Sequence, residues 1–213
     1  MKTLLIIGAG RGISYGVAKL FGKLGFTVIL VSRGLNLDEV IPALIAQNIT
    51  AVHFTCDISN PGQLTQVLAQ ILQKYGAIDI LHYNVAAAKA NNILNETSDS
   101  LIYDFTINVA GLLTVVNNVL PSMKIKGEGA ILITGGGFAL YPNQDYATLS
   151  IGKAALRTLN ELLYEELRSQ NITVGTVTVC GFVNDSDERF NPDAIARQFL
   201  KLYQREVAKE IVY

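Results

Sequence analysis

The amino-acid sequence predicts an α/β protein in which a parallel sheet carries helices on both faces. Short unbroken apolar runs alternate with helical segments along the 213 residues, and strands buried on both faces read as such runs. A glycine-rich turn follows the first run, and no internal repeat or low-complexity linker divides the chain. We therefore expect a single domain, residues 1–213, with a doubly wound parallel sheet of about seven strands joined by right-handed crossovers.

The first unit, residues 1–25, holds the turn that organises the prediction. Residues 3–7 form a buried strand, the turn follows directly, and apolar residues recur at helical spacing from Ile13 to Leu24. A helix start offers unpaired N–H groups and a positive dipole end, which suit a pyrophosphate, and glycines let the backbone come close. A tight connection without any ligand is the alternative interpretation.

The later elements follow from the same two patterns. Further strands are expected at residues 26–31, 51–56, 78–84, 130–134, 172–179 and 210–213, and further helices at 38–47, 60–74, 101–124, 146–168 and from 192 onwards. Asn60 before Pro61 indicates a helix start, because proline loses no hydrogen bond in the first turn. In a sheet of this kind, ligands collect at the carboxyl ends of the strands.

Composition limits the classes of partner. Hydrophobic residues make up 50% of the chain and charged residues 16%, with a net charge of -1, so neither nucleic acid nor a membrane surface is favoured. No uninterrupted apolar segment approaches the length of a membrane span and the chain opens on a strand, so we expect a cytoplasmic protein without a signal peptide. Cys56 and Cys180, the only cysteines, stand far apart without clustered histidines, which argues against a disulfide framework or a metal site.

Over nearly its whole length, the chain resembles the short-chain dehydrogenase/reductase superfamily. Gly8 and Gly12 match the first two glycines of the family's turn, whereas Ser14 followed by Gly16 resembles the turn of the divergent enoyl-reductase branch. The resemblance implies a Rossmann-like fold that binds a nicotinamide cofactor. The residues that we expect at the cofactor are Gly8, Gly10, Arg11, Gly12, Ile13, Ser14, Ser32, Arg33, Asp57, Ile58, Asn84, Val85, Ala86, Lys153, Gly181 and Val183.

The end of the second strand indicates which cofactor is preferred. An acidic residue there would hold a ribose 2′-hydroxyl and repel a 2′-phosphate, but this chain has Ser32 and Arg33. Arg33 can form two hydrogen bonds to a phosphate and Arg11 adds a second positive charge, so we expect NADPH to be preferred over NADH. Two solvated surface arginines are the alternative. Asp57 matches the residue that contacts the adenine in relatives, and a helix cap or turn residue is its other interpretation.

Two strand ends depart from the family pattern. Residues 83–86 stand where relatives carry Asn-Asn-Ala-Gly, and only Asn84 matches. The neighbouring His82 is interpreted as a structural residue of an apolar strand. After the sixth strand, Cys180 replaces the family's proline while residues 181–183 keep the pattern. We interpret Cys180 as a small packed residue at a strand end.

The residues at the family's catalytic positions differ even more from the family pattern. In relatives, a Ser-Tyr-Lys set reduces a carbonyl, and the lysine lowers the pKa of the tyrosine from about 10 and holds the nicotinamide ribose. Lys153 matches the family lysine, but Leu149 stands four residues earlier where the tyrosine belongs, and the serine position falls in the glycines at 135–137. Asn108 matches the helix asparagine that maintains a water path to the lysine, with a solvent-facing residue as the alternative.

Tyr146 offers a replacement for the missing tyrosine. It lies seven residues before Lys153, which is the spacing of the enoyl-reductase branch and nearly two helical turns, so both residues share one face. Tyr146 would support an enolate oxygen or protonate a carbonyl oxygen. A packed aromatic at a helix entrance is the alternative. Thr134 and Tyr141 are the only hydroxyls near the missing serine.

These residues lead to three hypotheses. The first is an NADPH-dependent oxidoreductase acting on a carbonyl or conjugated double bond of a small substrate, with Tyr146, Lys153 and Asn108 carrying the chemistry. The second is an NADP(H)-binding sensor or scaffold without catalysis, and the third a structural subunit with a vestigial site. The resemblance implies a homodimer or homotetramer formed through the two long helices. The short segment 184–191 indicates an open pocket or one that another subunit completes.

Overall fold

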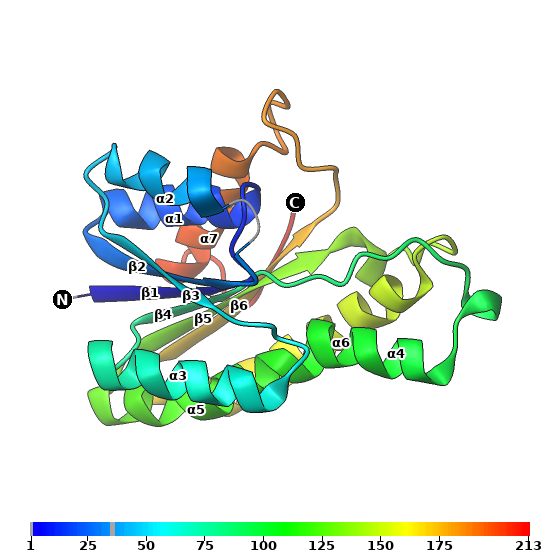
Figure 1. Ribbon diagram of the computed structural model, residues 1–213, viewed down its shortest axis with the longest axis horizontal. Coiled ribbons are helices and arrows are strands. Elements are labelled where there is room, and N and C mark those ends of the chain that lie inside the picture. The colour runs from blue at the N-terminus through cyan, green and yellow to red at the C-terminus, as the bar shows by residue number, and fades with distance from the viewer. Residues whose placement is uncertain (1, 35–36) are drawn as a thin grey trace.

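The computed structural model describes residues 2–34 and 37–213, which form the predicted doubly wound sheet (Figure 1). Residues 1, 35 and 36 lie outside the described part, and with them the first residue of the predicted opening unit. The strands are β1 (Lys2–Ile7), β2 (Phe26–Ser32), β3 (Ala51–Thr55), β4 (Ile80–Tyr83), β5 (Gly129–Gly136), β6 (Ile172–Val179) and β7 (Glu210–Val212). The α-helices are α1 (Ile13–Lys23), α2 (Leu37–Ile45), α3 (Pro61–Tyr75), α4 (Ser98–Phe105), α5 (Gly111–Lys126), α6 (Ala147–Leu167) and α7 (Pro192–Tyr203).

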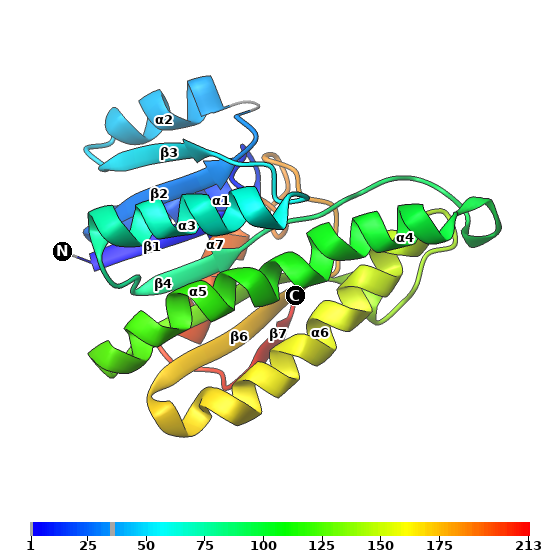
Figure 2. The same cartoon turned by 60° about the horizontal axis from the view of Figure 1, so that its bottom comes forward.

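The strand order is β3-β2-β1-β4-β5-β6-β7, and each neighbouring pair is parallel. The order reverses between β1 and β4, because the chain first adds strands on one side of β1 and then on the other. Helices α1, α2 and α7 cover one face, and α3, α5 and α6 cover the other (Figures 1 and 2). In such sheets the ligand crevice lies at the reversal, beyond the carboxyl ends of the strands.

The sequence of β1 shows why this sheet forms. Leu5 and Ile7 belong to the core beneath α3 and α5, whereas Leu4 and Ile6 belong to the core beneath α1 and α7. All four are wholly buried, and each contributes about 1.5–3 kcal/mol of transfer free energy. A strand buried on both faces needs apolar residues at every position, which is the run that the sequence shows.

The long helix predicted at residues 101–124 is in fact three segments. Thr97 caps α4 by accepting a hydrogen bond from the Ser100 N–H, so the helix begins at Ser98. A π-helical turn, Thr106–Ala110, then separates α4 from α5. The buried hydroxyl of Tyr83 in β4 donates a 2.6 Å hydrogen bond to the carbonyl of Ile107 and so ties this turn to the sheet. Such turns are rare and often lie at functional sites.

The combined stretch Ser98–Lys126 is long and apolar enough to cross a membrane by length and composition alone, contrary to the expectation above. This is weak evidence, because a core helix of a soluble protein meets the same criterion. Here Val115, Val119 and Met123 are wholly buried in the core beneath α3 and α5. Packing against the sheet therefore explains one face of α5, whereas 39% of the apolar window as a whole is buried.

Candidate cofactor and active site

Two cavities lie at the carboxyl ends of the strands, one on each side of the reversal. The β2–β3 cavity, about 310 Å³, is lined by residues that follow β2, β3 and β4. The β5–β6 cavity, about 470 Å³, is lined by residues that follow β5 and β6 and by Lys153 of α6. Asn84, Val85 and Ala86 line both. The two cavities are therefore the halves of one crevice that crosses the end of β4.

The glycine turn is held against the middle of this crevice. Gly8 has φ +86°, and a Cβ there would lie 2.6 Å from the carbonyl oxygen of Asn84. The N–H groups of Gly8 and Ala9 both donate to the carbonyl of Val31 at the end of β2. Gly12 precedes α1 without a side-chain cap. The first N–H groups of a helix have no partner within the helix, so this end of α1 suits an anion.

Ser14 stabilises the turn from inside. Its hydroxyl accepts a 2.8 Å hydrogen bond from the Gly10 N–H and donates a 3.0 Å bond to the Gly10 carbonyl. The Ser14 side chain is buried. It therefore closes the turn from inside, and the outer surface of the turn is formed by backbone atoms. Gly16, two residues later, has no room for a side chain, because a Cβ there would lie 2.3 Å from the carbonyl oxygen of Pro192. The small residue at this position lets α1 and α7 touch.

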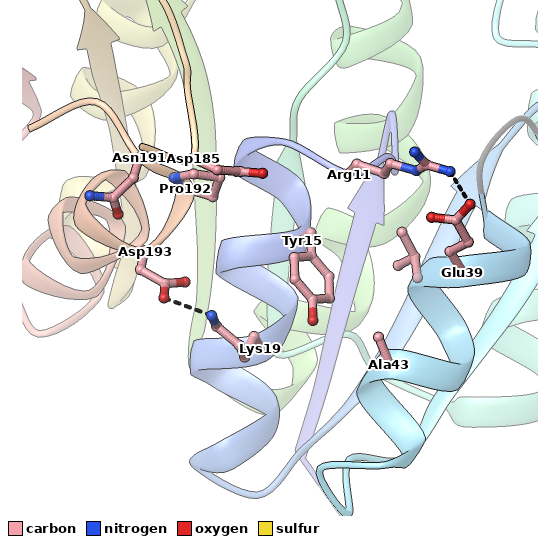
Figure 3. A pocket seen from close by; sticks show the side chains of 10 residues that line it. Arg11, Tyr15, Lys19, Glu39, Ala43, Asp185, Asn191, Pro192 and Asp193 are labelled. Atoms are coloured by element: carbon pink, nitrogen blue, oxygen red, sulfur yellow. Dashed lines mark hydrogen bonds and ion pairs between the residues drawn. The ribbon is translucent and has the colours of Figure 1, made fainter. Parts of the chain in front are cut away.

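The structure separates the two arginines predicted near the cofactor. Arg33 lines the β2–β3 cavity with Ser32 and Asp57. Arg11 forms an ion pair with Glu39 of α2 and lines a different cavity of about 440 Å³, between α1, α2 and the start of α7. Figure 3 shows its guanidinium directed at Glu39. Both partners are exposed, so the pair contributes little stability and can open.

Asp57 forms a turn at the edge of the β2–β3 cavity. Its Oδ1 accepts hydrogen bonds from the backbone N–H (3.0 Å) and hydroxyl (2.8 Å) of Ser59, as a turn residue does. These bonds lower the pKa of its carboxyl, and the positive charge of Arg33 lowers it further. Asp57 and the following Ile58 also line the β2–β3 cavity. The turn role is confirmed, and the contact with an adenine stays a prediction.

Lys153 is the buried cation of the β5–β6 cavity. It is 7% exposed, and its Nζ donates a 2.8 Å hydrogen bond to the carbonyl of Thr134. Burial lowers the pKa of its ammonium group to about 8. Leu149, which occupies the family's tyrosine position, lines the same cavity. A Cβ at Gly136 would lie 3.5 Å from the Lys153 methylenes, which is ordinary contact, so a side chain would fit there.

Tyr146 does not line either cavity. It precedes α6 as its N-cap residue, with φ −136° and ψ 53°, and its ring stacks on that of Phe138 at 5.6 Å. Phe138 itself lines the β5–β6 cavity, so Tyr146 stands behind it. The tyrosine that lines the cavity is Tyr141, which is 75% exposed. The packing interpretation of Tyr146 is confirmed, and its catalytic role stays a prediction.

Asn108 lies in the π-helical turn and is wholly buried, so a solvent-facing position is wrong. Its Oδ1 accepts a 2.7 Å hydrogen bond from the Ala87 N–H. Its Nδ2 has no partner among the described residues. A Cβ at Gly152 would lie 2.9 Å from Asn108, so α6 packs directly on the amide. A buried donor left unpaired in this way suits an ordered water or a ligand.

The wall beyond β6 differs from the sequence interpretation. Cys180 is exposed and lines the β5–β6 cavity, so its interpretation as a packed residue is wrong. Phe182 belongs to the segment 181–183 that keeps the family pattern. It is 90% exposed and lines the same cavity. A Cβ at Gly181 would lie 2.4 Å from the ring of Phe190, so the loop before α7 folds directly onto this strand end. The signal that the sequence offered for this wall was an aromatic residue, Phe182, directly after Gly181 at the end of a predicted strand.

Most residues predicted for the cofactor lie at the crevice. Those that line one or both cavities are Gly8, Ile13, Ser32, Arg33, Asp57, Ile58, Asn84, Val85, Ala86, Lys153, Gly181 and Val183. Gly10, Arg11, Gly12 and Ser14 belong to the adjoining turn and the start of α1. The predicted residues are therefore gathered at one edge of the sheet, and their contact with a cofactor stays a prediction. Thr134 and Tyr141, the hydroxyls noted near the missing serine, and Phe182 also line the β5–β6 cavity.

Comparisons with known proteins agree with this arrangement. The model of the family described as short chain dehydrogenase matches residues 2–194. Tropinone reductase-like 3 of Erythroxylum coca is 30% identical over 78% of this chain and 64% of its own length. The protein SDRA of Arabidopsis thaliana, a short-chain dehydrogenase/reductase, is 28% identical over 78% of this chain and 65% of its own length. The matched region thus spans just under two thirds of these relatives.

Solved structures share the fold. A metagenomic short-chain oxidoreductase in complex with NADP superposes with a TM-score of 0.89 at 22% identity, covering 99% of this chain and 95% of that one. An actinorhodin polyketide ketoreductase with NADPH gives a TM-score of 0.89 at 21% identity, covering 99% of this chain and 94% of that one. At these identities the likeness concerns the fold.

Proposed function

The chain belongs to the short chain dehydrogenase family, and from this premise we propose that it is an NADPH-dependent oxidoreductase acting on a carbonyl or conjugated double bond of a small substrate. The observation that carries the proposal is the divided crevice. One cavity has Arg33 and no acidic residue at the end of β2, and the other holds the buried Lys153. Three shared residues at the end of β4 connect them, as an extended dinucleotide requires.

The residues present fit such a cofactor. Gly8 and the uncapped start of α1 provide a backbone surface for the pyrophosphate. Arg33 favours a 2′-phosphate through its paired donors. When bound, NADPH would supply the hydride. The residues of this chain would hold the two halves of NADPH, exclude water and deliver the proton to the substrate.

Lys153 has two roles in this proposal. Because burial lowers its pKa to about 8, its ammonium form dominates at neutral pH and can donate hydrogen bonds to the hydroxyls of a ribose. A group with a pKa close to neutral also exchanges protons readily under working conditions. Within residues 2–34 and 37–213, the Asn108 side-chain N–H in the adjoining π-helical turn has no hydrogen-bond partner. It can therefore maintain the water path that supplies that proton.

Two tyrosines are candidates for the proton donor to the substrate. Tyr146 is the proposed donor, or the support for an enolate oxygen, and reaching the cavity requires its ring to leave the stack on Phe138. Tyr141 already lines the β5–β6 cavity and is the alternative donor. Both sites are tested with the same conservative change, tyrosine to phenylalanine.

The test is a panel of ketones, aldehydes and enones with NADPH, followed by Tyr146→Phe and Tyr141→Phe on each substrate that reacts. Loss of the working donor is expected to lower kcat about 10²- to 10⁴-fold. The variant that shows this loss identifies the donor. An absence of turnover on every substrate would overturn the oxidoreductase proposal, and undiminished turnover in both variants would remove the tyrosines from it.

A second candidate function is NADP(H) binding without catalysis, as a sensor or scaffold. It is favoured by Leu149 and Gly136, which leave the cavity without the two usual hydroxyls, and by the stacked position of Tyr146. Tight NADPH binding combined with no turnover on the same panel would support it. Substrate-dependent oxidation of NADPH would exclude it.

We also propose a cytoplasmic homodimer or homotetramer. Apolar side chains are exposed along α4, α5 and α6, among them Ile102, Leu113, Ile151 and Leu162. Apolar surface of this kind is typical of contacts between subunits. Light scattering on the purified protein would give the mass of a dimer or tetramer, whereas the mass of one chain, 23.1 kDa, would contradict the proposal.

A further inference from the structure

Beneath the crevice, three side chains form a hydrogen-bonded chain whose direction is fixed. The carbonyl of Gly8 can only accept, so the Asn84 side chain must turn its Nδ2 toward it, at 3.1 Å. Asn84 Oδ1 then faces the hydroxyl of Thr134, which donates to it at 2.8 Å. A hydroxyl has one proton to donate. His82 Nε2, 3.0 Å from the Thr134 oxygen, must therefore carry the proton of that bond.

The histidine is locked in one neutral form by its surroundings. His82 is wholly buried in β4, and its ring packs edge-on against Phe199 of α7 at 4.6 Å. Burial lowers its pKa to about 3, so it stays uncharged at neutral pH with the proton on Nε2. Its Nδ1 has no hydrogen-bond partner among the described residues. The ring is thus a fixed donor to Thr134.

Thr134 connects this histidine to both cavities. Its hydroxyl holds Asn84, which lines the β2–β3 and β5–β6 cavities and, through Nδ2, holds the glycine turn. Its backbone carbonyl accepts the hydrogen bond of Lys153 Nζ. Two buried polar residues therefore join the turn, the middle of the crevice and the buried cation.

Packing alone does not account for this pair. On the same face of the same two strands, two positions earlier, stand the wholly buried apolar residues Ile80 and Leu132. Polar groups cost free energy when they are taken from water into such a core. We propose that His82 and Thr134 are positioning residues of the cofactor site, acting through Asn84. This inference rests on the proposed function, because it concerns how tightly the crevice holds NADPH.

The hydrogen-bond direction can be tested without any cofactor. In the intact protein labelled with ¹⁵N, the expected spectrum of His82 shows Nε2 protonated, Nδ1 unprotonated and no change between about pH 5 and pH 8. A proton on Nδ1, or titration in that range, would overturn the chain of donors described above. This measurement does not depend on whether NADPH binds.

The positioning role is tested with matched threonine variants. Thr134→Val keeps the shape and removes the hydroxyl, and we expect the Kd for NADPH to rise about tenfold. Thr134→Ser restores the hydroxyl and is expected to bind NADPH within about twofold of the unsubstituted protein. The control is Thr176→Val in β6. Thr176 is also buried, its hydroxyl donates to the Ile133 carbonyl at 3.0 Å, and it does not line either cavity.

The control separates a positioning role from a structural one. Thr176→Val removes a buried hydrogen bond of the same kind, so it is expected to lower stability comparably and to leave the Kd for NADPH unchanged. Equal NADPH affinities in Thr134→Val and Thr176→Val would overturn the positioning role alone. Absence of NADPH binding by the unsubstituted protein would overturn the proposed function and the positioning role together.

Discussion

The two cavities of the crevice differ in what the fold demands of them. Beside the β2–β3 cavity, the turn must have glycine at position 8, because a Cβ would overlap the Asn84 carbonyl oxygen at 2.6 Å. In the β5–β6 cavity, a Cβ at Gly136 would make only ordinary contact with Lys153 at 3.5 Å. The half proposed to hold the nucleotide thus depends on backbone geometry, whereas the usual catalytic hydroxyls are side chains that the fold does not need. Loss of Ser and Tyr is therefore compatible with an intact crevice.

The largest effect is expected from restoring the two missing hydroxyls. Gly136→Ser combined with Leu149→Tyr places them beside Lys153, in a cavity of about 470 Å³ that has room for both. Carbonyl reduction with NADPH should rise about 10²- to 10⁴-fold, because a positioned proton donor contributes that much. The rate of NADPH oxidation with a ketone panel measures it, with each single variant as control. If the double variant binds NADPH fully but reduces ketones no faster, the missing hydroxyls are not what limits catalysis in the β5–β6 cavity.

The second effect compares the two glycines directly. Gly8→Ala introduces a Cβ at a positive φ and into the Asn84 carbonyl, so we expect a loss of about 2 kcal/mol in the free energy of unfolding and about 100-fold weaker NADPH binding. Gly136→Ala should change the free energy of unfolding by less than about 0.5 kcal/mol. Urea denaturation and a binding titration supply both values. Equal losses of stability in the two variants would contradict the contrast.

The third effect concerns how much the burial of Lys153 lowers the free energy of unfolding. Burial lowers the pKa of folded Lys153 from 10.5 to about 8, so the unfolded chain holds this proton more tightly. The free energy of unfolding should therefore rise between pH 8 and pH 10.5, while the folded state carries the full penalty below pH 8. Lys153→Met should raise stability at pH 7 by about 2 kcal/mol and weaken NADPH binding.

Urea denaturation at pH 7 and pH 10 checks this sign. The stability advantage of Lys153→Met is expected to shrink at the higher pH, because the unsubstituted lysine is then largely neutral in the folded protein. If the variant is less stable than the unsubstituted protein at pH 7, the hydrogen bond to the Thr134 carbonyl outweighs the burial penalty and the interpretation is wrong.

The smallest effects separate the two arginines. Arg33 lines the β2–β3 cavity, so Arg33→Ala should lower the ratio of NADPH affinity to NADH affinity about tenfold. Arg11 is paired with Glu39, and Arg11→Ala should lower the same ratio only about threefold. Dissociation constants for both nucleotides give the ratios. A larger effect at Arg11 would mean that its ion pair opens when the cofactor binds.

The sequence predicted the order of strands and helices well, because buried parallel strands leave unbroken apolar runs. The π-helical turn was missed, since one additional residue per turn barely disturbs the apolar periodicity of the stretch Ser98–Lys126. The seven-residue spacing placed Tyr146 on the face of Lys153, but Tyr146 precedes the first helical residue and has a non-helical backbone. Helical side-chain directions therefore do not apply to it.

The sequence also could not predict the contacts between segments that lie far apart in the chain. Nothing near Arg11 indicates that Glu39 lies beside it, because the pairing depends on how α2 packs against α1. His82 is buried in an apolar strand as the sequence predicted, but its hydrogen bond to Thr134 joins β4 to β5. Motif matching finds residues that meet a ligand, whereas such supporting contacts depend on the register between strands.

The central claim is that this crevice binds a phosphorylated nicotinamide dinucleotide, and calorimetric titration of the purified protein with NADPH and with NADH tests it most directly. We predict saturable binding of NADPH that is at least about tenfold tighter than that of NADH, because Arg33 lines the β2–β3 cavity and its guanidinium can donate paired hydrogen bonds to a 2′-phosphate. No binding of either nucleotide, or tighter binding of NADH, would contradict the account.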